Sequence, residues 1–337
     1  VSLGCPPARA PAPAGTFFCE GTSGPARENR RMWQTLPNSQ CQLGESPFWH
    51  PQERSLYWLD IPGRTVLRTR GALPDPGVER WSLPTEPGCI APARSGGLVI
   101  ALRDGIYRAR EWGGALQRMV QVDHDVRTMR FNDGKCDALG RLWAGSINEA
   151  KDRASAKLYC LDARGGRTPQ LSVMAEGVTT ANGLAFSPDA RTLYWADTPT
   201  HAVRAWNWEP QANLLSNERV FHRFAGKPEG WRVDQPAGYG GRPDGASVDA
   251  QGRYWVAMYE GAQVSCLDAG GTQLQSLPVP AQCPTMPCFG GDDLRTLFVT
   301  TGRHGRTSAE LARLPESGSV FHARVDAPGL PVNFFDD

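Results

Sequence analysis

One short pattern returns six times along the chain, and it limits the fold more than any other feature of the sequence. Each copy has a turn rich in Pro, Asp, Gly or Ser, then a basic or polar residue, then about five apolar or aromatic residues typical of a strand. The copies begin at Ser46, Ala91, Cys136, Ala185, Ser247 and Phe289. The corresponding strand residues are Tyr57, Leu98, Leu142, Tyr194, Tyr254 and Leu297. Hairpins repeated about every 40 to 60 residues are typical of propeller blades. The sequence therefore predicts an all-β fold, a six-bladed β-propeller, with an irregular β-sandwich as the alternative.

The segment before the first repeat has a different composition. Residues 1–40 are rich in Pro, Ala and Gly and lack a charged start followed by an apolar core, so they do not resemble a secretory signal. We expect an N-terminal extension over residues 1–40 and one propeller domain over residues 41–337, with the cytoplasm as the default location. Two longer gaps between repeats carry insertions, INEAKDRASAK from Ile147 and FAGKPEGWRVDQPAGYGG from Phe224.

Composition excludes several classes of partner and reaction. The formal net charge of +1 predicts no binding to nucleic acid or to an anionic membrane surface. No apolar run approaches the roughly 20 residues of a membrane helix. The nine cysteines show no zinc-finger spacing, so we expect buried free thiols rather than a disulfide framework. A serine hydrolase is not indicated, because no G-x-S-x-G motif is present.

Side chains with oxygen atoms precede several of the repeats. In a propeller the innermost strand of each blade lines the central channel, so residues that enter these strands meet at one mouth. Glu45, Asn182 and Asp244 occupy this position in three repeats, and Asn182 and Asp244 are each followed by a glycine. Two carboxylates and one amide oxygen match a hard divalent cation. The sequence therefore predicts one divalent metal ion at the mouth, Ca²⁺ first, with Zn²⁺, Mn²⁺, Mg²⁺ or Fe²⁺ as alternatives.

Five ordered motifs resemble those of a known family. They are GESPFW…LYWLDI, RFNDGKCDALGRLWAGSI, ANGLAFSPDARTLYWADT, RPDGASVDAQGRYWVAM and PTMPCFGGDDLRTLFVTT. From about Leu43 to about Phe335 the chain is similar to the senescence marker protein, gluconolactonase and luciferin-regenerating enzyme family. The resemblance implies a six-bladed propeller that hydrolyses sugar lactones with one divalent metal at the channel mouth.

The same resemblance implies roles for individual residues. The family's metal ligands fall on Glu45, Asn182 and Asp244, and Asp244 also corresponds to the carboxylate credited with acid–base catalysis. The family's substrate-contacting Arg and Asn fall on Arg130 and Asn132. Some members carry an acidic substrate contact after the third repeat, where this chain has Asn148 followed by Glu149 and Ala150. We expect Asn148 to contact substrate, with Glu149 as the open alternative.

The expected function is hydrolysis of a small sugar lactone, in which Asp244 accepts a proton from water and Arg130 and Asn132 hold the sugar. Asp133 and Lys135 are expected to support the loop rather than touch substrate. One alternative is a phosphotriesterase or arylesterase on the same fold. Another is a calcium-binding propeller without catalytic turnover.

Overall fold

The protein is a ring of six antiparallel sheets. The computed structural model describes residues 1–2 and 32–337. In this part of the chain every sheet has four strands, and five of the six sheets follow chain order from the innermost to the outermost strand. This arrangement confirms the six-bladed β-propeller and excludes the β-sandwich. Most of the predicted N-terminal extension lies outside the described residues.

The six repeats correspond to the six blades. The first blade contains β2 (Gly44–His50), β3 (Ser55–Asp60), β4 (Thr65–Arg70) and β5 (Gly77–Ser82). The second contains β6 (Pro87–Pro92), β7 (Leu98–Leu102), β8 (Gly105–Ala109) and β9 (Gln117–Gln121). The third contains β10 (Met129–Cys136), β11 (Leu142–Asn148), β12 (Ala156–Asp162) and β13 (Gln170–Val178). The fourth contains β14 (Ala181–Phe186), β15 (Thr192–Asp197), β16 (Ala202–Glu209) and β17 (Leu214–Arg223). The fifth contains β18 (Arg242–Val248), β19 (Tyr254–Tyr259), β20 (Gln263–Leu267) and β21 (Gln273–Pro278). The sixth blade contains β22 (Pro284–Gly290), β23 (Thr296–Thr301) and β24 (Phe321–Arg324). Within residues 33–337 the helical segments are η1 (Arg164–Gly166), η2 (Thr198–Thr200) and α2 (Ser308–Arg313).

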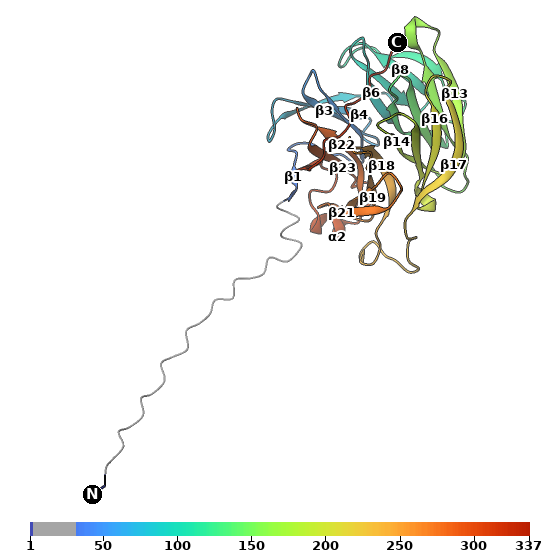
Figure 1. Ribbon diagram of the computed structural model, residues 1–337. Helices are drawn as coiled ribbons and strands as arrows, with labels where there is room; N and C mark the ends of the chain where they lie inside the picture. The colour runs from blue at the N-terminus through green and yellow to red at the C-terminus, as the bar shows by residue number, and fades with distance from the viewer. Residues whose placement is uncertain (3–31) are drawn as a thin grey trace.

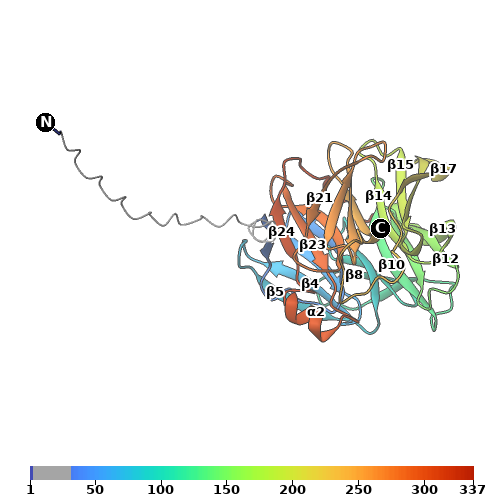
Figure 2. The same cartoon turned by 90° about the horizontal axis from the view of Figure 1, so that it is seen from below.

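The two ends of the chain meet in the sixth blade. Its outermost strand is β1 (Gln34–Thr35), which pairs with β24 through Gln34 opposite His322 and Thr35 opposite Phe321. Figure 1 shows blue β1 at the edge of the sixth blade, whose other strands are red. In Figure 2 the strands β23 and β24 lie next to β4 and β5 of the first blade. The sixth blade therefore takes one strand from the segment that the sequence analysis assigned to the extension.

The hydrophobic core is divided among the contacts between neighbouring blades. Six clusters of buried residues occur, and each joins side chains of two adjacent blades. For example, Cys89, Val99 and Ile106 of the second blade pack with Phe131 and Tyr159 of the third. All seven described cysteines are buried and unpaired, as expected, whereas Cys5 and Cys19 lie outside the described residues. No described helix is both long and apolar enough to cross a membrane.

Each innermost strand contains one irregularity near its beginning. In β2, Glu45 lies opposite Leu59 and Phe48 lies opposite Tyr57, so one extra residue is accommodated. Shifts of one residue also occur in β6, β10, β14, β18 and β22. Such bulges bend a strand and redirect its side chains. Here they bend all six strands at the same end of the channel.

Candidate functional site

Glu45, Asn182 and Asp244 lie at the bulges of three innermost strands. Glu45 is in β2, Asn182 in β14 and Asp244 in β18, and all three side chains are buried, with 3–7% of their surface exposed. Asn132 lies at the bulge of β10 and is equally buried. The residues that the sequence predicts for one site therefore enter the channel at one mouth.

The backbone that leads into two of these strands is held by aspartates from the neighbouring strand. Asp60, at the end of β3, accepts hydrogen bonds from the backbone N–H groups of Gln42 (2.9 Å) and Leu43 (3.1 Å), just before Glu45. Asp197, at the end of β15, accepts from Thr179 and Thr180, both at 3.1 Å, just before Asn182. The aspartates that end the repeated sequences SLYWLD and TLYWAD thus fix the backbone just before the two strands that carry Glu45 and Asn182.

A chain of hydrogen bonds links three blades at the mouth. Asn132 Nδ2 donates to Asn182 Oδ1 at 2.7 Å, and Asn182 Nδ2 donates to Thr198 Oγ1 at 2.8 Å. Thr198 Oγ1 in turn donates to the carbonyl of Pro243 at 2.8 Å, next to Asp244. These contacts orient the Asn182 amide and leave one lone pair of its oxygen for another ligand.

Glycines follow Asn182 and Asp244 because neighbouring strands approach closely. Gly183 has φ +61°, and a Cβ there would lie 2.4 Å from the hydroxyl of Tyr254. A Cβ on Gly245 would lie 2.5 Å from Met286. Both distances are too short for a side chain, so only glycine permits this packing at the channel axis.

The carboxylates at the mouth are buried close to one another. Burial, followed by the charges of Asp244 and Asp133, raises the pKa of Glu45 well above its usual value. Burial and the charge of Asp133 raise the pKa of Asp244 to about 8. Burial raises the pKa of Asp133 to about 6. Burial therefore shifts each carboxyl group towards its neutral form, and a nearby positive charge would oppose this shift.

The donor set fits a divalent cation. No described side chain donates a hydrogen bond to Glu45 or Asp244, and Asp133 Oδ1 is buried without a partner. Two mutually repelling carboxylates and an oriented amide oxygen are the ligands that hard cations prefer. Within the described ranges, no group of three or more His, Cys, Asp or Glu side chains could hold a metal ion. The candidate set therefore needs the amide oxygen of Asn182.

Arg130 lies between the candidate ligands and an acidic residue of the third blade. Its Nη1 donates to Asn132 Oδ1 at 2.8 Å, and its Nε lies 3.5 Å from Glu149 Oε1. Glu149 also pairs with Arg103 at 2.8 Å. Asn148, by contrast, is buried, and its Nδ2 donates to Asp152 Oδ1 at 2.6 Å.

Asp133 and Lys135 make the supporting contacts expected of them. The backbone N–H of Leu184 donates to Asp133 Oδ2 at 2.8 Å, and Lys135 Nζ donates to the carbonyl of Ala246 at 2.8 Å. Each side chain thereby joins the third blade to another blade.

Sequence reasoning missed Thr198, Lys151 and Arg242. Thr198 orients Asn182 from a 3₁₀ turn, and the sequence carries no signal of this contact. Arg242 stands two residues before Asp244, and Lys151 lies in the insertion after the third repeat. Both positions could have been noted as basic residues near the predicted mouth.

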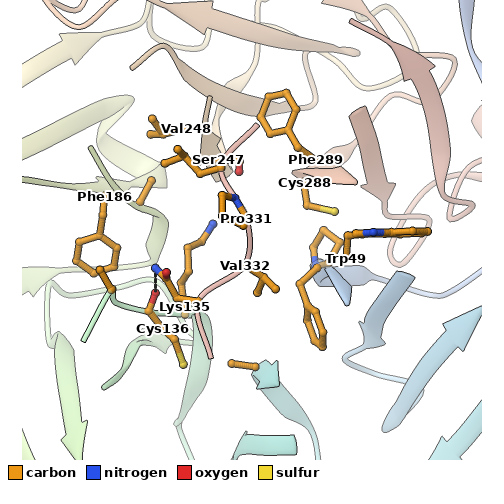
Figure 3. Close-up of a pocket in the computed structure, with 18 of the residues that line it drawn as sticks. Trp49, Lys135, Cys136, Phe186, Ser247, Val248, Cys288, Phe289, Pro331 and Val332 are labelled. Atoms are coloured by element: carbon orange, nitrogen blue, oxygen red, sulfur yellow. Dashed lines mark hydrogen bonds between the residues drawn. The ribbon is translucent and has the colours of Figure 1, made fainter. Parts of the chain in front are cut away.

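The other end of the channel holds a cavity of about 260 Å³ lined by both apolar and polar residues. Its lining includes Phe48, Phe186 and Phe289, and residues 330–333 near the C-terminus also line it. Figure 3 shows Pro331 and Val332 amid the lining side chains of the surrounding strands. None of the candidate ligands lines this cavity.

Comparisons with known proteins agree with the motifs and the fold. Residues 43–303 match the family described as the SMP-30/Gluconolactonase/LRE-like region. The chain is 38% identical to the 6-deoxy-6-sulfogluconolactonase of Pseudomonas putida over 87% of this chain and 94% of that protein. It is 31% identical to the regucalcin of Homo sapiens over 85% of this chain and 91% of that protein. The crystal structure of a calcium-binding protein, regucalcin, from Agrobacterium tumefaciens has the same fold, with a TM-score of 0.79 at 23% identity over 90% of this chain and 97% of that one. The chain therefore belongs to the SMP-30/gluconolactonase/LRE-like family.

Proposed function

We propose that the protein is a metal-dependent sugar lactonase whose active site lies at the mouth where the innermost strands begin. The observation that carries this proposal is the set formed by Glu45, Asp244 and the Asn182 amide oxygen, contributed by three blades. Both carboxylates are buried, and because burial and the charges of neighbouring carboxylates raise their pKa values, a cation bound between them would stabilise their ionised forms. The names of relatives support the class of substrate, since one of them is a sulfogluconolactonase.

The residues at the mouth would have different roles in the reaction. Glu45, Asn182 and Asp244 would hold the cation, which would stabilise the negative charge that develops on the lactone carbonyl oxygen. Asp244 would accept a proton from the water that attacks the carbonyl carbon. Arg130 would donate to oxygen atoms of the sugar. Asn132 would accept from a sugar hydroxyl through Oδ1, because its Nδ2 already donates to the carbonyl of Ala181 and to Asn182 Oδ1.

Glu149, rather than Asn148, is the residue to which we assign a substrate-facing role in the third blade. The amide of Asn148 already donates to Asp152 Oδ1 and to the carbonyl of Arg153. The carboxylate of Glu149 is 38% exposed and lies beside Arg130. A sugar hydroxyl could therefore reach Glu149 without breaking a buried contact.

The proposal is tested by the acid released during lactone hydrolysis. Glucono-, galactono-, arabino- and xylono-lactones are offered to the protein after treatment with a chelator, and then after separate addition of Ca²⁺, Zn²⁺, Mn²⁺ and Mg²⁺. We expect turnover that depends on added metal. Equal turnover in chelator and in metal would contradict metal dependence.

A calcium-binding propeller without turnover is the second candidate, because a solved structure with this fold is described as a calcium-binding protein. Calcium binding measured by calorimetry, without hydrolysis of any lactone, aryl ester or phosphotriester, would favour it over a hydrolase.

A further inference from the structure

Both insertions that separate the repeats lie at the same mouth as the candidate site. Asn148 is opposite Met129 at the start of β10, so residues 149–155 leave the sheet at that end. Residues 224–241 lead directly into Arg242, the first residue of β18. Arg242 is opposite Tyr259, which places Glu260 and the turn after β19 at this end as well.

Around Glu260, which lies at this end, cations outnumber carboxylates. Glu260 is shared by Lys227 at 2.6 Å, Arg242 at 3.3 Å and Arg306 at 3.4 Å. Of these three cations, only Arg306 has a second acidic partner, Glu310 at 2.7 Å. One carboxylate therefore remains for Lys227 and Arg242 together.

Lys151 adds a further unneutralised charge. Its backbone has φ 56°, and its N–H closes a turn on the carbonyl of Asn148 at 3.0 Å. The neighbouring acid, Asp152, pairs with Arg153 instead, and in the described part of the chain Lys151 forms no ion pair. The side chain of Lys151 is exposed, so it is accessible to a ligand.

Arg242 also keeps unused hydrogen-bonding capacity. Its Nε is buried and has no acceptor among the described residues, whereas its Nη2 lies beside Glu260. Arg242 stands two residues before Asp244 in β18, and the turn that holds Lys151 follows the end of β11 at the same mouth. Both cations are therefore placed at the mouth that holds the carboxylate we assign to catalysis.

The carboxylates of the candidate metal site cannot neutralise these cations. Glu45 and Asp244 together supply the two negative charges that a divalent cation needs, so Lys151 and Arg242 remain in excess once the ion is bound. A guanidinium with a free N–H and a nearby ammonium match the several oxygen atoms of a sulfonate or a phosphate.

We propose that the lactone bound at this mouth carries a sulfonate or phosphate group on its exocyclic carbon, and that Lys151 and Arg242 bind this group. The proposal rests on the lactonase function proposed above and names its class of substrate. Neutral sugar lactones would be hydrolysed at the same site with lower efficiency.

The test compares three lactones with the metal-loaded full chain. D-glucono-lactone is neutral, 6-phosphoglucono-lactone carries a phosphate, and 6-deoxy-6-sulfoglucono-lactone carries a sulfonate. We expect kcat/KM to be about 10- to 100-fold higher for at least one anionic lactone, since hydrogen bonds to charged groups are stronger than neutral ones. The better of the two anionic lactones identifies the group that is bound.

Lys151→Gln and Arg242→Gln test the two residues. Each variant is expected to lower the ratio of kcat/KM for the anionic lactone to that for the neutral lactone by about tenfold, mainly through KM. Lys151 is exposed, so its variant also gives a result if Arg242→Gln folds poorly. Arg54→Gln is the matched control, because Arg54 pairs with Asp292 in an exposed turn at the opposite end of β2.

The two proposals fail in different ways. If neutral and anionic lactones are hydrolysed equally and the ratio is unchanged in Lys151→Gln, the anionic substrate is excluded while the lactonase remains. If no lactone is hydrolysed, the lactonase proposal fails. Calorimetry then compares 6-phosphogluconate with gluconate as ligands, and equal affinity in the wild-type protein would overturn the anion site as well.

Discussion

Asp244 combines two roles that a single substitution can separate. An asparagine at this position keeps one oxygen for a cation but cannot accept a proton from water. We expect Asp244→Asn to keep the fold and to lower kcat by about 10²- to 10⁴-fold, the usual contribution of a general base. Steady-state kinetics on the best lactone, with metal content measured for each sample, checks this expectation.

Two variants serve as comparisons for Asp244→Asn. Asp292→Asn makes the same chemical change at an exposed aspartate paired with Arg54, and it should not alter kcat. Arg130→Ala removes a donor that holds substrate, so KM should rise at least as much as kcat falls. Turnover close to that of the wild type in Asp244→Asn would assign the base to another group.

The buried carboxylates also make the stability of the metal-free protein depend on pH. In the unfolded chain an aspartate loses its proton near pH 4, whereas the pKa of Asp244 in the folded protein is about 8. Between these values the folded state binds more protons, so the free energy of unfolding falls as the pH rises. We expect the Tm of the metal-free protein to decrease from pH 5 to pH 8.

A bound divalent cation should oppose this decrease of Tm with rising pH. Binding of a cation favours the charged carboxylates, so it should stabilise the protein more at pH 8 than at pH 5. At 100 times the dissociation constant the gain is about 2.7 kcal/mol. Thermal unfolding with and without Ca²⁺ at both pH values measures the effect, and an equal gain at both would argue against a site made of Glu45 and Asp244.

At the scale of single elements, the repeated hairpins contain their own buried ion pairs. In the third blade Asp137 Oδ2 accepts from Arg141 Nε at 2.6 Å and from Trp143 Nε1 at 2.8 Å. In the fifth blade Asp249 receives the same contacts from Arg253 and Trp255, at 2.6 and 2.8 Å. The shared pattern D-A-x-G-R-x-W is thus explained by the folding of a hairpin.

Loss of this aspartate should destabilise the blade strongly. Asp137 and Arg141 are both at most 1% exposed, so Asp137→Ala leaves the Nε–H of a buried guanidinium and a buried indole N–H without an acceptor and removes the counter-charge of Arg141. We expect the free energy of unfolding to fall by about 3–5 kcal/mol, measured by chemical denaturation.

Asp125→Ala is the control for this variant, since Asp125 forms an exposed ion pair with Arg127. It should change stability very little. A similar loss in both variants would show that the buried contacts of Asp137 contribute no more than a surface pair.

At the scale of the whole molecule, the ring depends on a short segment at the N-terminal end of the described chain. Trp33 is buried between the fifth and sixth blades, and its Nε1 donates to the carbonyl of Pro278 at 2.6 Å. It directly precedes β1, which completes the sixth blade. Contacts of this kind join residues more than 240 positions apart in sequence.

Removal of the Trp33 side chain should therefore weaken closure of the ring. We expect Trp33→Ala to lower the free energy of unfolding by about 3–5 kcal/mol, as for other buried tryptophans. Met32→Ala changes an adjacent side chain that is 43% exposed and should have a small effect. Equal stability of the two variants in chemical denaturation would mean that the ring does not need this contact.

The sequence by itself determined the number of blades and the candidate ligands. Turn residues and apolar strands are local signals, and six copies of the turn-and-strand pattern were sufficient to predict the fold. Glu45, Asn182 and Asp244 could be chosen because residues at the same phase of a repeat occupy equivalent places in a ring.

Only the tertiary structure decided the contacts that depend on which blades are neighbours. The Asn182 amide is oriented by Asn132 of β10 and by Thr198 of η2, and β1 pairs with a strand near the far end of the chain. Likewise, Lys151 reaches the mouth where β18 begins with Arg242 through an insertion that carries no repeat. The physical reason is that hydrogen bonds and charge interactions between distant segments form only after the ring has closed, and a single sequence has no local pattern that encodes them.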